Sequence, residues 1–83
     1  MNVRLHPHAR ERIAERGATV AEVVGTVEHG GRAPAKHGRT CFQRNFPFGA
    51  EWLGRRYANK QVLAYAVPEA GGWLVITVIV RYF

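Results

Sequence analysis

Residues 61–82 decide the fold, and they read QVLAYAV (61–67), PEAGG (68–72) and WLVITVIVRY (73–82). The first and last of these segments are rich in β-branched and aromatic residues, which favour strands. The segment between them holds a proline and two adjacent glycines, so the three segments together predict a β-hairpin. Side chains alternate between the two faces of a strand, and the last segment is apolar on both faces. We therefore expect the last segment to lie centrally in a sheet.

Two further strands are expected on the N-terminal side of this hairpin. In residues 39–46 the even positions include two phenylalanines, whereas the odd positions are mostly polar. This alternation is typical of a half-buried strand, and the sequence PFG (47–49) is expected to end the strand. Residues 52–57 are a weaker candidate, because Gly54 interrupts them. The prediction is therefore an antiparallel sheet of three or four strands.

Two helices are expected before the strands. The first covers residues 8–16, since Pro7 is tolerated in a first helical turn and Gly17 supplies a left-handed stop. The second starts at Thr19, where the sequence TVAE (19–22) is a capping box, and valines at positions 20, 23, 24 and 27 follow the spacing of one buried face. The fold class is therefore α+β, with an N-terminal helical hairpin packed on the antiparallel sheet.

Length and composition exclude several classes of protein. The 83 residues suffice for a single domain, residues 1–83, with one small core. The chain has no serine and no aspartate, which excludes serine-nucleophile triads, paired-aspartate sites and aspartate-rich calcium loops. Cys41 is the only cysteine and is expected to be a structural thiol in a reducing compartment, and the histidines fall at no metal-ligand spacing. We therefore expect no metal and no cofactor.

The chain has no apolar signal core near its N-terminus, and its longest apolar run, residues 73–80, is far shorter than the roughly 20 residues of a membrane helix. We therefore expect a cytoplasmic protein without a membrane partner. An unpaired strand at the edge of the sheet could pair with a second copy of the chain, so a homodimer is one of the expected possibilities.

The charge is concentrated in one segment. The chain carries 12 basic and 6 acidic side chains, a net charge of +6, and residues 36–60 alone contribute +5. Five aromatic residues are interleaved with these cations, and this combination suits RNA or single-stranded nucleic acid, because cations meet phosphate while rings stack on bases. The alternative is that the charge keeps a small protein soluble while the aromatics form its core. The candidate nucleic-acid-binding residues are Arg39, Arg44, Arg55, Arg56 and Arg81.

The first helix holds the clearest candidate for chemistry. His8, Arg12 and Arg16 follow one another at intervals of four residues and so lie along one side of the helix. A histidine exchanges protons near neutral pH, and arginines stabilise developing charge on phosphate, as RNA cleavage without a metal requires. Lys60, expected at a strand turn, completes the catalytic candidates. The ordinary alternative is that the two arginines pair with neighbouring glutamates, that His8 caps the helix and that Lys60 is solvated.

Four short motifs occur in order along nearly the whole chain: HxxxRxxxRG (8–17), NFP (45–47), KxV (60–62) and VITVxxxYF (75–83). In this order they resemble an uncharacterised bacterial family catalogued as domain of unknown function 4258. That family is similar to the small RNase toxin domains of the RelE and BrnT type.

This resemblance implies N-terminal helices paired with an antiparallel sheet, and RNA cleavage without a metal by scattered Arg, Lys, Tyr and His residues. It implies a first-helix site at His8, Arg12 and Arg16, with Lys60 and Arg81 as candidates on the sheet. No motif within the family defines a catalytic set.

The leading hypothesis is an RNA-binding domain of the toxin-like kind, and activity as a metal-independent endoribonuclease is left open. The main alternative is a non-catalytic basic module that docks on nucleic acid or on an acidic protein partner such as an antitoxin. A third hypothesis is an enzyme acting on a nucleotide or another phosphorylated metabolite, which would require a concave pocket near His8.

Overall fold

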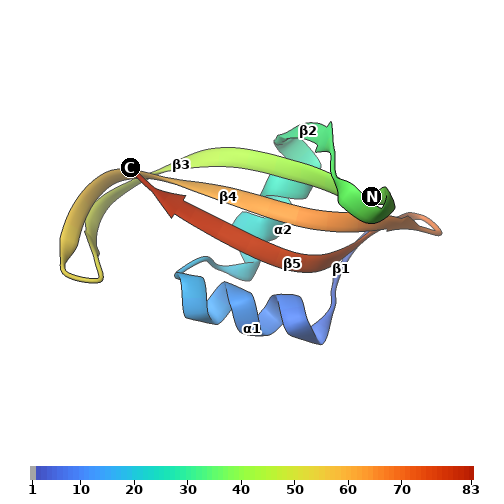
Figure 1. Ribbon diagram of the computed structural model, residues 1–83, viewed down its shortest axis with the longest axis horizontal. Coiled ribbons are helices and arrows are strands. Elements are labelled where there is room, and N and C mark those ends of the chain that lie inside the picture. The colour runs from blue at the N-terminus through green and yellow to red at the C-terminus, as the bar shows by residue number, and fades with distance from the viewer. Residues whose placement is uncertain (1) are drawn as a thin grey trace.

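The computed structural model describes residues 2–83, which form two α-helices and one five-stranded sheet (Figure 1). The elements in chain order are β1 (Asn2–Leu5), α1 (Pro7–Arg16), α2 (Val20–His29), β2 (Gly31–Pro34), the 3-10 turn η1 (Lys36–Gly38), β3 (Thr40–Trp52), β4 (Arg55–Glu69) and β5 (Gly72–Tyr82). The predicted α+β class is confirmed. None of the described helices is long and apolar enough to cross a membrane.

The sheet is mixed, with the strand order β1-β5-β4-β3-β2. β1 runs parallel to β5, with Asn2 opposite Gly72, and the other neighbours are antiparallel. The predicted antiparallel pairing is confirmed for β2, β3, β4 and β5, but the sheet has five strands and the parallel β1 was not predicted. The prediction missed the two edge strands because each has only four residues, and four residues carry almost no periodic signal.

β3 and β4 form a long hairpin that curls away from the rest of the sheet at one end (Figure 1). β3 continues through Pro47 because a register shift between Pro47 and Ala50 accommodates the proline at a bulge. The turn is Leu53-Gly54, both with positive φ (50° and 82°), as a two-residue hairpin turn requires. The weaker strand predicted over residues 52–57 is in fact this turn with the adjoining ends of β3 and β4.

The helix boundaries follow the predicted signals closely. Gly17 ends α1 in the left-handed region, with φ 78°. At the start of α2 the capping box is complete: the Glu22 N–H donates to Thr19 Oγ1 at 3.1 Å, and the Thr19 N–H donates to Glu22 Oε1 at 2.9 Å. These signals are local, which is why the sequence predicts them well.

The two helices do not pack mainly on each other, so the predicted helical hairpin is wrong as a packing unit. α1 lies along β5, whereas α2 crosses β4 and β3 behind the sheet (Figure 1). Ala9 and Ile13 of α1, and Val23 and Val27 of α2, point into the core between the helices and the sheet. Each helix therefore buries its apolar side against a different part of the curved sheet.

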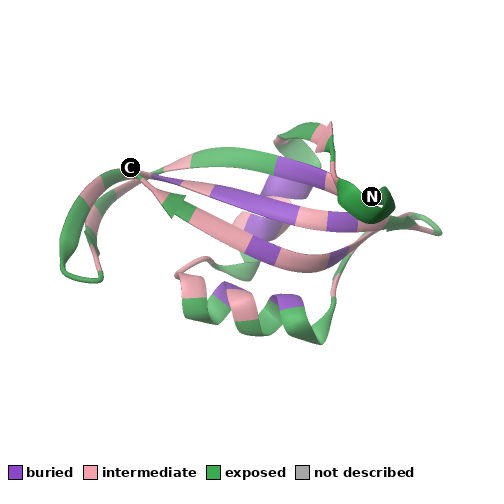
Figure 2. Ribbon diagram, in the orientation of Figure 1, coloured by how far each residue is buried: buried purple, intermediate pink, exposed green. Residues whose placement is uncertain are grey.

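The core fills the space between the helices and one face of the sheet. Buried residues lie in the middle of β3, β4 and β5, near the place where α2 passes behind the sheet (Figure 2). The largest fully buried side chains are Phe42, Val23, Val62, Val75, Val78 and Thr26. β5 has a neighbour on each side, as expected for residues 73–82, but the predicted central place in the sheet belongs to β4.

Candidate functional site

The sheet surface turned away from the helices, here called the open face, carries both polar and apolar side chains, and Val67 opposite Leu74 extends its apolar part. Phe42 is in register with Ala64 and faces the core, so the neighbouring strand positions point the other way. The register places three rows on the open face, from β3, β4 and β5 in turn: Cys41, Tyr65 and Thr77; Gln43, Leu63 and Ile79; Asn45, Gln61 and Arg81. The alternation predicted for residues 39–46 is confirmed.

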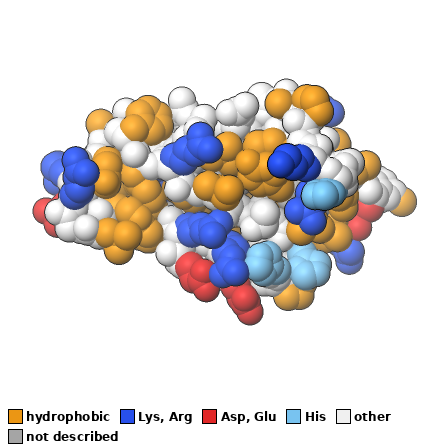
Figure 3. Space-filling model, viewed as in Figure 1, with side chains coloured by type: hydrophobic (Ala, Val, Ile, Leu, Met, Phe, Trp, Pro, Cys, Tyr) orange, Lys and Arg blue, Asp and Glu red, His pale blue; other side chains and the backbone are white. Residues whose placement is uncertain are grey.

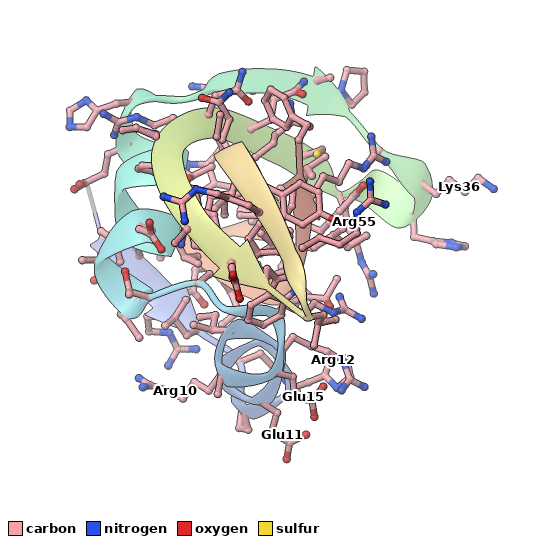
Figure 4. The ribbon with its side chains drawn as sticks, turned by 90° about the vertical axis from the view of Figure 1, so that its left-hand side faces the viewer. Arg10, Glu11, Arg12, Glu15, Lys36 and Arg55 are labelled. Carbon is pink, nitrogen blue, oxygen red and sulfur yellow. The ribbon has the colours of Figure 1, made fainter. Side chains whose placement is uncertain are left out.

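Cations gather on the side of the molecule to which the open face points. Lys36 and Arg55 lie on the opposite side of the sheet from α2, and Arg12 of α1 points toward the same side, whereas Arg10 points away (Figure 4). Arg81 belongs to the open face by register. Lysine and arginine side chains are spread over this view of the surface, and acidic side chains are confined to its margins (Figure 3).

The connection between β2 and β3 borders one end of the open face and forms with it an open pocket of about 490 Å³. The connection supplies Ala35, Lys36, His37 and Arg39 to the pocket, and the sheet supplies Pro34, Cys41, Tyr65, Thr77 and Ile79. No carboxylate lines this pocket among the described residues 2–83. The pocket therefore combines a cationic rim with a partly apolar wall.

Tyr65 lies on the pocket floor beside Cys41. Burial raises the pKa of the Tyr65 phenol above its ordinary value, the neighbouring Cys41 raises it further, and Arg81 partly opposes them. The phenol therefore stays protonated at neutral pH and can donate a hydrogen bond to a bound group. His37 stands at the rim in the left-handed region, with φ 63°, and its side chain is exposed.

The predicted first-helix stripe is divided between two environments. His8 is exposed in the first turn of α1, and the cap is made by His6, whose Nδ1 accepts the His8 N–H at 3.1 Å. Arg12 donates to Glu15 at 2.7 Å, so it pairs with a neighbouring glutamate, which was the alternative to a role in chemistry. Arg16 instead turns to the sheet and donates to the Val78 carbonyl. Since eight helical residues rise about 12 Å, His8 and Arg16 do not meet at one phosphate.

Lys60 is not at a strand turn, as expected from the sequence, but inside β4 with a buried side chain. Its Nζ lies 2.9 Å from Glu22 Oε1, donates to the Gly17 carbonyl at 2.9 Å, and lies 5.5 Å from the centre of the Phe48 ring. These contacts use the ammonium to hold the turn between α1 and α2 against the sheet. The structure does not bring Lys60 into an open site with His8.

Aromatic side chains complete this attachment of the helix turn. The Tyr82 hydroxyl donates to the Arg16 carbonyl at 2.6 Å, so Tyr82 and Lys60 together satisfy carbonyls at the end of α1. Trp52 stacks on Tyr82 with ring centres 4.9 Å apart. Burial, and then the charge of Glu22, raise the pKa of Tyr82 above its ordinary value. We call Glu22, Trp52, Lys60 and Tyr82 the helix-turn clamp.

The predicted nucleic-acid-binding arginines also separate. Arg39 lines the pocket and Arg81 lies on the open face, so these two share a surface. Arg44 is on the helix side, where it reaches the Gly25 carbonyl at 3.4 Å and lies over the Phe46 ring. Of the two at the hairpin tip, Arg55 lies over Tyr57, and Arg56 donates to the Gly49 carbonyl at 3.0 Å.

Four residues of the pocket were not predicted as site residues: Lys36, His37, Tyr65 and Thr77. Lys36 contributed only to the net charge of its segment. No sequence spacing connects the four residues, because the pocket is formed by residues that are far apart in the chain. Their one sequence signal is the cluster of three basic side chains at Lys36, His37 and Arg39 after a proline.

Among residues 2–83, no group of three or more His, Cys, Asp or Glu side chains is placed to hold a metal ion. The comparisons with known proteins add no relative: no protein-family model, no curated protein and no solved structure matches this chain. The resemblance to the family of unknown function stays a prediction.

Proposed function

We propose that the protein binds single-stranded RNA through the open face. The observation that carries the proposal is that Lys36 and Arg39 line a pocket on the open face and that Arg81 and three amides, Gln43, Asn45 and Gln61, lie on the same face beyond it. Arginine and lysine bind backbone phosphates, and together they supply affinity that does not depend on sequence. We also propose that the protein belongs to the toxin-like family that its sequence motifs resemble.

The side chains between these cations favour RNA over other polyanions. Gln43, Asn45 and Gln61 present amides that can donate to and accept from base edges, and Tyr65 offers an aromatic ring. Single-stranded RNA exposes such edges and ring faces, whereas the bases of a double helix are stacked inside. An acidic protein partner, the main alternative, would use the cations but would have no comparable need for the amides and the ring.

We expect RNA affinity to fall with salt, with a log–log slope of about −2 if three cations each contact a phosphate, since each contact on a single strand contributes about −0.7. Arg39→Gln and Arg81→Gln should each weaken binding and make the slope shallower by about 0.7. The matched control is Arg10→Gln, which removes a cation pointing to the other side of the molecule (Figure 4). Fluorescence anisotropy with a labelled oligonucleotide measures all four proteins. A flat slope, or an equal loss in Arg10→Gln, would contradict RNA binding at the open face and favour the acidic protein partner.

A second candidate function, RNA cleavage, is favoured by one observation: His37, Tyr65 and three cations are close to the same pocket. In this reaction the imidazole of His37 takes the proton of a ribose 2′-hydroxyl, and the 2′-oxygen attacks the adjacent phosphorus. The bond to the 5′-oxygen breaks, and that oxygen takes a proton from water as it leaves, so the products are a 2′,3′-cyclic phosphate and a 5′-hydroxyl. Lys36 and Arg39 stabilise the charge that develops on the phosphate.

Cleavage of labelled RNA by the purified protein in EDTA tests this second function. We expect His37→Ala to lower the rate by about 10²–10⁴-fold, the usual contribution of a general base, with little change in RNA affinity. His8→Ala is the matched control, because His8 is an exposed histidine of α1 that does not line the pocket. Loss in His8→Ala alone would move the base to α1, and bound but intact RNA would contradict catalysis and leave the binding function.

A further inference from the structure

The pocket beneath the β2–β3 connection has two chemically different sides. Lys36, His37 and Arg39 place positive or protonatable groups at the rim, whereas Pro34 and Ile79 form part of an apolar wall. With a volume of about 490 Å³, the pocket falls in the range of sites for small organic ligands. A matching ligand therefore joins an anionic group to a flat, largely apolar ring.

The pocket floor adds hydrogen-bonding groups that a purely apolar ring would leave unused. Thr77 contributes a hydroxyl, and the protonated phenol of Tyr65 contributes a donor beside an aromatic face. A ring with polar edges, such as a nucleobase, satisfies these groups, whereas an unsatisfied buried polar group would cost affinity.

We propose that this pocket binds one nucleotide, with the base against Ile79 and Tyr65 and the phosphate against Lys36 and Arg39, so that the protein also binds free nucleoside monophosphates. This inference rests on the proposed function, because the pocket opens on the face that we assign to RNA and Arg81 continues the cationic surface beyond Ile79 along β5. When a longer RNA strand binds the open face, the nucleotide in the pocket would be the one in the strand whose phosphate lies nearest His37.

Isothermal titration calorimetry with adenosine 3′-monophosphate tests the inference, with adenosine and inorganic phosphate as the two halves of the ligand. We expect the nucleotide to bind at least tenfold more tightly than either half, because each half uses one side of the pocket. Arg39→Gln should weaken nucleotide binding about tenfold by removing a charge-assisted hydrogen bond, and should leave adenosine binding unchanged. Tyr65→Leu should weaken both nucleotide and adenosine, and Arg10→Gln should change neither.

Arg39→Gln alters the rim and not the core, so it tests the inference even if Tyr65→Leu does not fold. Nucleotide binding no tighter than that of inorganic phosphate, or an equal loss in Arg10→Gln, would overturn the pocket assignment. The same proteins assayed with labelled RNA separate the two proposals. RNA binding without nucleotide binding overturns only the pocket, and nucleotide binding without RNA binding overturns the proposed function and the RNA role of the pocket.

Discussion

Replacing Gly17 with alanine is expected to destabilise the fold by about 3 kcal/mol, which is a large fraction of the stability of so small a domain. Gly17 adopts φ 78°, and an L-residue in the left-handed region costs about 1–2 kcal/mol. A Cβ at this position would also collide with the Tyr82 hydroxyl and lie 2.6 Å from the Trp52 ring, and overpacking of this kind costs about 1–3 kcal/mol.

Gly71 provides a matched control, because its φ of 77° is nearly identical and no atom lies within 4 Å of its expected Cβ. Gly71→Ala therefore carries the backbone cost without the collision. Urea denaturation of both variants gives the difference, which we expect to be about 1–3 kcal/mol in favour of Gly71→Ala. Equal losses would mean that the helix-turn clamp moves aside without cost, and would contradict the rigid packing of Trp52 and Tyr82 over the turn.

The parts of the fold that could be predicted from the sequence are those with local signals. Gly17 as a helix stop, the capping box at Thr19 and the hairpin of residues 61–82 are specified by neighbours within a few positions, and all three were predicted. The parallel pairing of β1 with β5 joins Asn2 to Gly72, seventy positions apart. A four-residue strand has no signal that could identify such a distant partner.

The candidate site was less predictable than the fold for the same reason. The sequence places Lys60 beside other polar residues, and nothing local shows that Glu22 and the Gly17 carbonyl surround its ammonium. Likewise, the alternation of residues 39–46 predicts which side chains share a face, but not that the connection before Arg39 forms an open pocket with that face. The concentration of charge in residues 36–60 did indicate the segment that contains Lys36 and Arg39, because a charge count does not depend on knowing the contacts.

The ion pair of the helix-turn clamp leads to the second large effect. The side chain of Lys60 is 8% exposed and that of Glu22 is 21% exposed, so removing one charge leaves the other poorly solvated. Glu22→Gln keeps an acceptor for the Thr19 N–H but leaves the buried ammonium without its carboxylate. We expect a loss of about 3 kcal/mol, the lower end of the range for breaking a buried pair, because Glu22 is partly hydrated.

Lys60→Met should be milder, at about 1–2 kcal/mol, because methionine fills similar space without a charge and the less buried Glu22 can be hydrated, although the Gly17 carbonyl loses its donor. The double variant should recover most of the loss seen in Glu22→Gln alone. Urea denaturation of the wild type, both single variants and the double variant closes the thermodynamic cycle. Additive losses would contradict a direct coupling between the two charges.

Lys60→Met also decides between the two roles that Lys60 has been given. If its ammonium serves only the clamp, the folded variant should retain any RNA binding or cleavage that the wild type shows. If the ammonium acts on phosphate, a stably folded Lys60→Met protein would lose activity while Glu22→Gln, assayed below its unfolding midpoint, would retain it. The contacts at Glu22 and Gly17 favour the first result.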